Sequence, residues 1–310
     1  MGENTKAQKS LKSINMTKVV PFLGLIFVIV LFAALTKGEL LNPGNTVTLF
    51  NSLFSTGLGA VGVFFVMAQG NIDFSIGSII ALAGSLCAMA YNDISPVLIV
   101  PVALLTGTAI GVVNGFLVAK VKVPAFIATL SMSFIIRGIA TVVLGGVYGI
   151  SFEANAFDSM FVKVPVLIIT FIIGYIIFEY TKFGKHSRAI GSLPEAARQN
   201  GVEVTRTRWT AFIISGFMSG LIGFFSVVRS CTITPLSGTG HEFNVLIALL
   251  VGGMAMTGGW TAKFRSVIIG CLFITFLALG MSLMGLDVYM QQLVKGIIFI
   301  VSVLITERGN

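Results

Sequence analysis

The amino-acid sequence predicts an all-α polytopic membrane protein with about ten transmembrane helices and both termini in the cytoplasm. Hydrophobic residues make up 55% of the 310 residues and charged residues only 10%, which leaves too little polar surface for a water-exposed globular protein. Apolar stretches of about twenty residues recur along the chain, and this is the length that crosses a bilayer as a helix. Basic residues gather in alternate breaks between these stretches.

Short polar breaks divide the apolar part of the chain into ten predicted spans. They cover residues 19–36, 46–68, 74–91, 96–119, 125–146, 163–181, 209–229, 242–259, 266–284 and 288–306. We interpret 19–306 as one transmembrane domain, between a basic cytoplasmic tail at 1–18 and a short cytoplasmic tail at 307–310. The first stretch follows several lysines, as a cleaved signal peptide does. It is longer than a usual signal core and lacks an A-x-A cleavage site, so we expect an uncleaved span.

The distribution of lysine and arginine sets the predicted orientation. With the N-terminus in the cytoplasm, the tail lysines and most loop basic residues fall on one side. The loop and C-terminal residues on that side are Lys120, Lys122, Lys182, Lys185, Arg188, Arg198, Arg206, Arg208, Lys263, Arg265 and Arg308. Only Lys37, Lys163 and Arg229 fall outside. The net charge of +8 therefore belongs mainly to the cytoplasmic face, where it favours membrane lipid over nucleic acid as a partner.

Glycines at four-residue spacing predict helix packing. Gly107, Gly111 and Gly115 follow one face of the fourth span, and Gly216 and Gly220 repeat the pattern in the seventh. Such small-residue faces let helix backbones approach closely in a membrane. We expect both faces to be packing surfaces within the bundle.

Cysteine and histidine are too few and too scattered for most enzyme chemistry. Cys87, Cys231 and Cys271 are an odd number at wide spacing, so they predict neither a disulfide framework nor a CxxC metal site. His186 and His241 do not form an H-E-x-x-H pattern. We therefore expect no catalytic residue, no metal site and no cofactor bound by this chain.

Two glycine-rich breaks interrupt the helical pattern. Residues 69–78 separate the second and third spans, and residues 251–260 end the eighth. Asp73 or Ser75 is suited to cap the helix that follows the first break. That break is either a tight cytoplasmic turn or a broken helix that lines a transport pathway. Both breaks are in positions that could flank an inner gate.

Arg137 lies near the centre of the fifth span, where a charge costs about 2.5–3.5 kcal/mol. It must face protein or water. It either ties down carbonyl groups that a broken neighbouring helix frees, or it lies on the pathway. The candidates for pathway or gate residues are Asn51, Asp73, Ser75, Asn114 and Arg137.

The polar segment 182–208, between the sixth and seventh spans, predicts a short helix. Ser192 and Glu195 form an S-x-x-E capping box, Pro194 falls in the first turn, and Gly201 supplies a left-handed stop. About two turns are marginal in water, so we expect this helix to pack on the bundle or on a partner protein. The surrounding arginines suit partner docking, and alternatively they only enforce topology. No stretch matches the ATP-binding pattern G-x-x-x-x-G-K-[ST], so ATP would be bound elsewhere.

Several segments together resemble the permease subunits of ribose-type ABC importers for monosaccharides, which are relatives of the branched-chain amino acid permeases. N-I-D-F-S-I-G-S at 71–78 is similar to the family's G-I-D-L-S-V-G-S. V-P-A-F-I-A-T-L at 123–130, with N-G at 114–115 and R-G at 137–138, resembles its N-G, P-x-F-I-x-T-L and R-G elements. F-G at 183–184, A-I-G at 189–191 and E-A-A-R at 195–198, continuing to G-V at 201–202, are similar to its cytoplasmic loop.

The resemblance implies a permease subunit in the cell (plasma or inner) membrane that carries a monosaccharide or similar solute into the cytoplasm. It implies a homodimer, or a heterodimer with a related permease, docked on a two-domain ABC ATPase that binds ATP and Mg. It also implies an extracytoplasmic solute-binding protein, and a loop at 182–208 that transmits nucleotide-driven motion. The coupling residues in that loop are Ser192, Pro194, Glu195, Ala197, Arg198 and Gly201.

The chain departs from the family pattern at three places, namely Ser192-Leu193, Glu242-Phe243-Asn244 and Trp260-Thr261-Ala262-Lys263. Another polyol, a nucleoside or a signalling sugar therefore stays open as the solute. Two other classes stay open as well. An ion-coupled secondary transporter or channel more often places carboxylates inside its spans, whereas Asp73 and Glu179 fall near predicted span ends. An integral membrane enzyme would have few histidines and cysteines to use.

Overall fold

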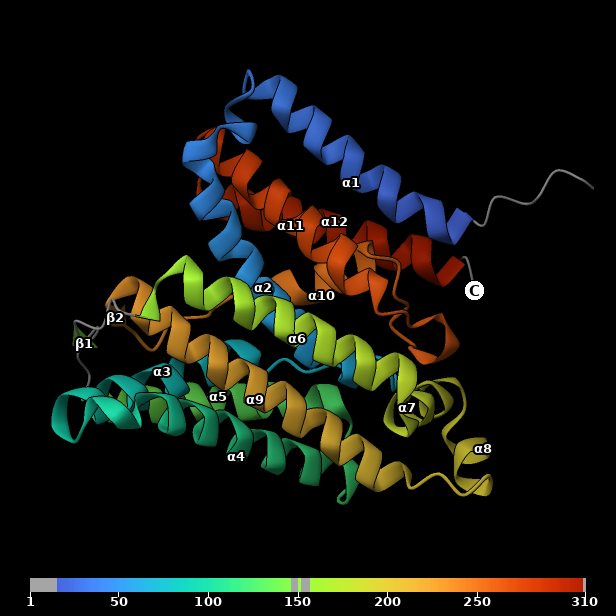
Figure 1. The fold of residues 1–310 in the computed structure, drawn as a ribbon. Coiled ribbons are helices and arrows are strands. Elements are labelled where there is room, and N and C mark those ends of the chain that lie inside the picture. The colour runs from blue at the N-terminus through green and yellow to red at the C-terminus, as the bar shows by residue number, and fades with distance from the viewer. Residues whose placement is uncertain (1–15, 146–149, 152–156, 309–310) are drawn as a thin grey trace, which may run out of the picture.

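The chain is built almost entirely of helices (Figure 1). A computed structural model describes residues 16–145, 150–151 and 157–308. The α-helices are α1 (Met16–Leu35), α2 (Thr46–Met67), α3 (Ile76–Asp93), α4 (Ile99–Ala119), α5 (Ala125–Val143), α6 (Met160–Tyr180), α7 (Lys182–Ser192), α8 (Pro194–Gln199), α9 (Val204–Ser230), α10 (His241–Val251), α11 (Arg265–Leu283) and α12 (Val288–Arg308). The 3₁₀ helices are η2 (Glu39–Leu41), η3 (Pro43–Asn45), η4 (Pro96–Leu98) and η6 (Gly259–Thr261). Two short strands, β1 (Ile150–Ser151) and β2 (Thr232–Ile233), pair antiparallel.

Within the described part of the chain, seven helices are long and apolar enough to cross a membrane. They are α2 with η3, α3, α4 with η4, α5, α6, α9 and α11. Three further apolar segments, Val20–Leu35, His241–Val251 and Val288–Leu304, are shorter. The helical membrane class predicted from the sequence is confirmed, whereas the count of ten spans stays a prediction.

The predicted span at 242–259 is wrong as a continuous helix. Its helix, α10, has 11 residues and ends at Val251, so it extends about 16 Å at 1.5 Å per residue, against a hydrocarbon core of about 30 Å. The chain stops the helix because Gly253 takes a left-handed φ of 93°. A Cβ atom on Gly252 would lie 2.0 Å from the Ser266 carbonyl oxygen of α11. The helix thus ends where the backbone of α11 lies against it.

The glycine faces predicted to be packing surfaces pack against each other. A Cβ atom on Gly107 of α4 would lie 2.3 Å from the carbonyl oxygen of Gly216 in α9. A Cβ atom on Gly111 would lie 2.5 Å from the carbonyl oxygen of Phe212, and one on Gly220 2.4 Å from that of Ala103. The α4 and α9 backbones are therefore closer than any residue larger than glycine permits.

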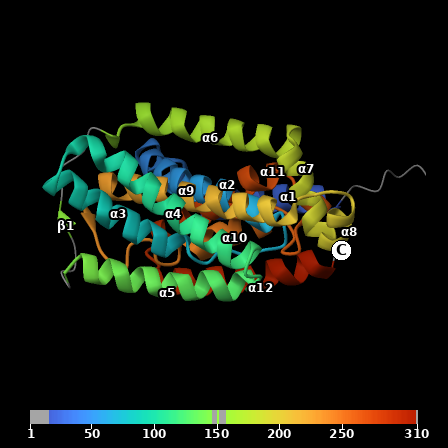
Figure 2. The ribbon, with the colours of Figure 1, turned by 90° about the horizontal axis from the view of Figure 1, so that it is seen from below.

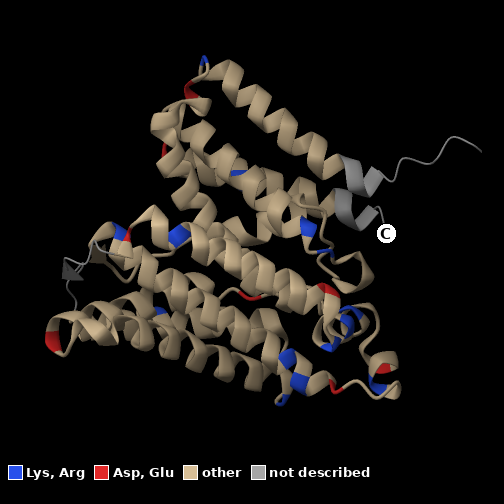
Figure 3. Cartoon of the chain, in the orientation of Figure 1, with Lys and Arg blue, Asp and Glu red and all other residues tan. Residues whose placement is uncertain are grey.

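One end of the molecule collects the chain ends and most of the positive charge. The start of α1 and the end of α12 lie at the same end as α7 and α8 (Figures 1 and 2). Lysine and arginine residues, coloured blue, gather mainly at that end (Figure 3). Seen from below, α5 and α12 lie along one side of the molecule and α6 lies along the opposite side (Figure 2).

Candidate functional site

The first glycine-rich break holds a buried carboxylate. Residues 71–75 run without helical structure between α2 and α3, and Asp73 is only 1% exposed there. Its Oδ1 accepts hydrogen bonds from the Ser75 backbone N–H at 2.9 Å and the Ser75 hydroxyl at 2.6 Å. Its Oδ2 accepts one from the Ser215 hydroxyl of α9 at 2.7 Å. The sequence predicted that Asp73 or Ser75 caps α3, but neither side chain forms a capping hydrogen bond with α3. The Asp73 carboxylate bonds to Ser75 and to Ser215 of α9 instead.

Two neighbouring helices complete this polar cluster. Asn114 of α4 donates from Nδ2 to the Ser75 hydroxyl oxygen at 2.8 Å. Thr129 of α5 accepts a hydrogen bond from the Phe74 backbone N–H at 3.1 Å. We call Asp73, Ser75, Asn114 and Ser215 the break cluster. It brings together three of the pathway candidates predicted from the sequence and ties the break to α4 and α9.

The second glycine-rich break lies directly against the first. The Gly259 backbone N–H donates to the Ala68 carbonyl oxygen at 2.9 Å. A Cβ atom on Gly258 would lie 2.4 Å from the Met67 carbonyl oxygen, and one on Gly70 2.9 Å from that of Thr257. The two breaks, far apart in sequence, thus form one contact region at the end of the bundle that holds α7 and α8.

The C-terminal end of helix α7 packs against this contact region. A Cβ atom on Gly191 would lie 2.2 Å from the Ala68 carbonyl oxygen and 2.3 Å from the Gly259 nitrogen. The Ser192 hydroxyl oxygen accepts from the Trp260 backbone N–H at 3.3 Å. The end of α7 therefore contacts both breaks at once through backbone, where a side chain has no room.

Buried polar groups further anchor the first break to the loop helices. Gln69, 2% exposed, donates from Nε2 to the Ser187 hydroxyl at 3.2 Å and to the Thr207 carbonyl oxygen at 3.3 Å. Ser187 lies in α7 and Thr207 at the start of α9. Motion of α7 must therefore be accommodated at Gln69.

The predicted capping box is wrong, whereas the predicted short helix and its stop are confirmed. Helix α8 has Leu193 as its N-cap, with no side-chain capping bond. Leu193 is extended, at φ −157°, because a residue before proline avoids the helical region. Ser192 therefore remains the last residue of α7, and its hydroxyl turns to Trp260. Pro194 begins α8, and Gly201 ends the turn at a φ of 78°.

Helix α8 packs on the bundle and leaves one charged face open. Ala197 is buried against Ile190 of α7 and Val204 of α9. Glu195 and Arg198 are 72% and 55% exposed and form an ion pair at 3.2 Å. Both line a cavity of about 270 Å³ between α8 and the α4–α5 connection, and Asn71 of the first break lines the same cavity.

Arg137 lies apart from the break cluster. Its Nη1 donates to the Pro235 carbonyl oxygen at 2.8 Å. Pro235 belongs to the irregular connection between β2 and α10. The arginine thus binds a carbonyl group of a non-helical segment.

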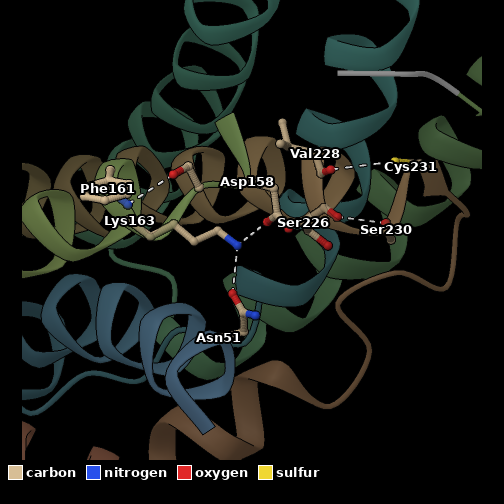
Figure 4. A network of polar contacts seen from close by, with 9 residues as sticks. Asn51, Asp158, Phe161, Lys163, Ser226, Val228, Ser230 and Cys231 are labelled. Atoms are coloured by element: carbon tan, nitrogen blue, oxygen red, sulfur yellow. Dashed lines mark hydrogen bonds and ion pairs between the residues drawn. The ribbon is translucent and has the colours of Figure 1, made fainter. Parts of the chain in front are cut away.

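Asn51 belongs to a different network at the opposite end of the molecule. Lys163 of α6, predicted to lie in an outer loop region, is only 2% exposed. Its Nζ donates to Asn51 Oδ1 at 2.7 Å and forms an ion pair with Asp158 (Figure 4). Asn51, Lys163 and Arg229 line a cavity of about 350 Å³ there. Asn51 is therefore engaged by a buried cation rather than placed with the other candidates.

Sequence reasoning missed Ser215, Gln69 and Lys163 as site residues. Ser215 bonds to Asp73, which is 142 positions away in the chain. Gln69 bonds to Ser187 and Thr207, which are 118 and 138 positions away. A spacing rule carries no signal over such separations. For Lys163, the signal available was its position five residues after Asp158 at a helix start.

Comparison with known proteins adds a second line of observation. The model of the family described as "Branched-chain amino acid transport system / permease component" matches residues 45–303. The chain is 32% identical to the ribose import permease protein RbsC of Bacillus subtilis over 308 residues, 95% of this chain and 94% of that protein. It is 32% identical to the L-arabinose ABC transporter permease protein AraH of Azospirillum brasilense, over 92% of this chain and 87% of that protein. No solved structure matches it.

Proposed function

The chain belongs to the family of branched-chain amino acid transport system permease components, and on that premise we propose that it is the membrane-spanning subunit of an ATP-driven importer for a monosaccharide or similar small polar solute. Relatives named as ribose and L-arabinose permeases support this solute class. As a member of a permease family the chain is a transport subunit, and ATP and Mg would be bound by a separate ATPase.

The contacts of α7 and α8 support the proposal most directly. The end of α7 contacts both glycine-rich breaks, at Ala68 and Gly259, while α8 beside it presents Glu195 and Arg198 to solvent. A partner protein outside the membrane could bind an exposed helix of this kind, and its movement would then displace the buried breaks to which the helix is joined. A displacement of α8 and α7 would reach the breaks through Gly191 and Ser192, because these two residues contact the breaks without an intervening flexible side chain.

The arrangement of chain ends and charges supports the orientation. The ends of the described chain, α7 and α8 share one end of the molecule with most of the lysine and arginine. We take that end as cytoplasmic, because basic residues favour the cytoplasmic side. Residues 19–306 then form one permease domain of about ten helices, with 182–208 as its ATPase-coupling loop. The start of α1 and the end of α12 lie at the same end of the molecule, and an even number of membrane crossings requires this.

Members of this family work with an ATPase and a solute-binding protein in general. We assign the exposed face of α8 to a two-domain ABC ATPase and the opposite end to an extracytoplasmic solute-binding protein. Two permease subunits, identical or related, would enclose the pathway. The ATP-bound and ATP-free partner would favour different states of the breaks through different contacts with α8, which is how a partner shifts a conformational equilibrium.

A matched pair of substitutions tests the coupling role of α8. Glu195→Ala should abolish the stimulation of ATP hydrolysis by solute-loaded binding protein in the reconstituted importer, because it removes half of the exposed ion pair on α8. Glu203→Ala is the control: Glu203 is 70% exposed and also pairs with an arginine three residues later, Arg206, at 3.6 Å. It lies outside α8, so stimulation should stay near the unsubstituted level.

Normal stimulation in Glu195→Ala, or equal loss in both variants, would contradict the assignment of α8 as the coupling helix. Recovery of the intact complex by gel filtration shows whether each variant still assembles.

A further inference from the structure

A cavity with a mixed polar and apolar lining lies between the N-terminal end of α10 and one face of α12. The two helices pack against each other (Figure 1). Its volume is about 670 Å³, within the range of about 300–1,000 Å³ that is typical of small-molecule sites. Its lining includes Glu242, Phe243, Asn244, Gln291, Gln292 and Lys295, together with Thr239 and Gly240. Thr239 and Gly240 belong to the irregular segment that precedes α10.

Polar side chains gather in this cavity although both helices are apolar overall. Glu242 and Asn244 come from α10, and Gln291, Gln292 and Lys295 come from successive turns of α12. Polar residues inside membrane helices are costly and face protein or a water-filled cavity. All five can bind a hydroxyl group, which donates one hydrogen bond and accepts others: the three amides both donate and accept, Glu242 accepts and Lys295 donates. This inventory suits a polyhydroxylated molecule.

Several of these groups are not used by the protein itself. Glu242 Oε2 is buried and has no hydrogen-bond partner in the described structure, while its Oε1 accepts from the Gly240 N–H at 3.3 Å. Lys295 forms no ion pair or hydrogen bond with the described residues. Gln291 donates to the Leu286 carbonyl oxygen at 3.0 Å, which leaves its own side-chain oxygen available. Among these groups, Glu242 Oε2 is a buried atom without a partner, and leaving such an atom unpaired costs about 1–3 kcal/mol. Gln291 and Lys295 are partly exposed, so their free hydrogen-bonding groups are open to a molecule with hydroxyl groups.

The charges of the cavity favour an uncharged ligand. One carboxylate, Glu242, and one ammonium group, Lys295, balance each other, and the other polar groups are amides and a hydroxyl. Phe243 and Phe299 add aromatic rings to the wall, and such rings pack against apolar faces. A sugar ring has hydroxyls at its edge and C–H groups on its faces, so it matches both kinds of surface.

The cavity is also joined to the first break. The Phe243 ring packs edge to face against the Phe74 ring, with centroids 5.8 Å apart. A Cβ atom on Gly77, at the start of α3, would lie 2.3 Å from Glu242 Oε2. A shift of residues 71–77 would therefore move two groups that line the cavity. A pathway site needs such a contact, because its affinity must change as the gate moves.

We infer that this cavity is the solute-binding site of the permease, and that it takes a neutral monosaccharide or similar polyol, whose hydroxyl groups form hydrogen bonds with Glu242, Asn244 and Gln292. The inference rests on the proposed function and adds the location and the residues. It replaces Asn51 and Asn114 as solute-contacting candidates, because those side chains are bonded to Lys163 and Ser75.

The test is uptake of [14C]D-ribose and [14C]L-arabinose by the complete importer in proteoliposomes with internal ATP. Asn244→Ala and Gln292→Ala should each raise KM about tenfold for the sugar that is carried, as the loss of a ligand hydrogen bond does. Leu293→Ala is the control, because Leu293 is 56% exposed on α12 and does not line the cavity. Its KM should remain unchanged. Gel filtration checks assembly of each variant.

The outcomes separate this inference from the function on which it rests. ATP-dependent uptake with an unchanged KM in both cavity variants overturns the site and leaves the importer function standing. Uptake of neither sugar by the unsubstituted importer refutes the proposed solute class, and the site assignment falls with it.

A second measurement does not depend on transport or on the choice of sugar. In a chain with Cys231→Ser, a single Gln292→Cys should react with a membrane-impermeant maleimide in at least one state of the importer, because the cavity holds water when no solute is bound. Leu293→Cys, exposed on α12 outside the cavity, should stay unreacted, because an apolar surface of a membrane helix is expected to face lipid and not water. Failure of position 292 to react both with and without ATP would overturn the cavity as a solute site.

Discussion

At the scale of single residues, Asp73 shows what a sequence pattern can and cannot predict. The pattern of the break marks Asp73, Ser75 and Asn114 as unusual polar residues among apolar ones, and the structure brings these three together. It does not indicate Ser215, whose hydroxyl bonds to Asp73 across 142 positions. Asp73 does lie near a span end, just before α3, as predicted. The pattern did not indicate that it is buried there against the middle part of α9.

The break cluster should behave as one energetic unit. Asp73→Ala and Ser215→Ala should each lower thermal stability in detergent, and the double variant should lose less than the sum of the two. The interaction energy expected for such hydrogen-bonded neighbours is about 0.5–3 kcal/mol. The measurement is a double-mutant cycle of unfolding transitions followed by gel filtration after heating.

Ser85→Ala provides the matched comparison for this cycle. Ser85 is also fully buried, but its hydroxyl donates only to the Ala81 carbonyl oxygen of its own helix. Its effect should add to that of Asp73→Ala. An additive result for Asp73 with Ser215 as well would show that the break is not held to α9 by this hydrogen bond.

At the scale of elements, local signals predicted helix existence well and helix ends less well. Pro194 and Gly201 lie where the sequence placed them, at the start and stop of α8. The capping box failed because Pro194 forces the helix boundary onto Leu193, one residue later than Ser192. The eighth span failed because apolar composition continues past Val251, while the backbone of α11 and the following glycines end the helix there.

The glycine faces of α4 and α9 were predictable as packing surfaces from their spacing, although their pairing was not. Gly107→Ala should destabilise the protein by about 1–3 kcal/mol, the usual range for overpacking, because the new methyl group would lie 2.3 Å from the Gly216 carbonyl oxygen. Gly138→Ala on α5 is the control, since a Cβ atom there meets nothing within 4 Å. Its free energy of unfolding should stay within about 0.5 kcal/mol of that of the unsubstituted protein.

Equal unfolding temperatures for Gly107→Ala and Gly138→Ala would contradict the close approach of α4 and α9. Both variants carry the same chemical change, so the difference between them reports packing alone.

At the scale of the whole molecule, a continuous set of contacts runs from the exposed face of α8 to the cavity beside α12. It passes from α7 through Gly191 to Ala68 and Gly259, and from the first break through Phe74 to Phe243. The class of protein, the basic end and the short helix α8 could be predicted from composition and motif alone, whereas the docking role of its loop stays a prediction. The cavity could not, because its lining comes from α10 and α12, which no periodicity relates.

The remaining alternative at this scale is a carrier driven by an ion gradient, for which a buried carboxylate such as Asp73 would be expected. Here both carboxylate oxygens of Asp73 accept hydrogen bonds from serine groups of the same chain. That arrangement fits a structural tie better than a site that loads and unloads an ion.

Accumulation of solute in liposomes tests the central claim, that this chain is a passive gate moved by a separate ATPase. The purified chain alone, without nucleotide and with an imposed proton or sodium gradient, should accumulate no sugar, whereas liposomes that also contain the ATPase, internal ATP and external binding protein should accumulate it. Gradient-driven accumulation by the chain alone would contradict the account.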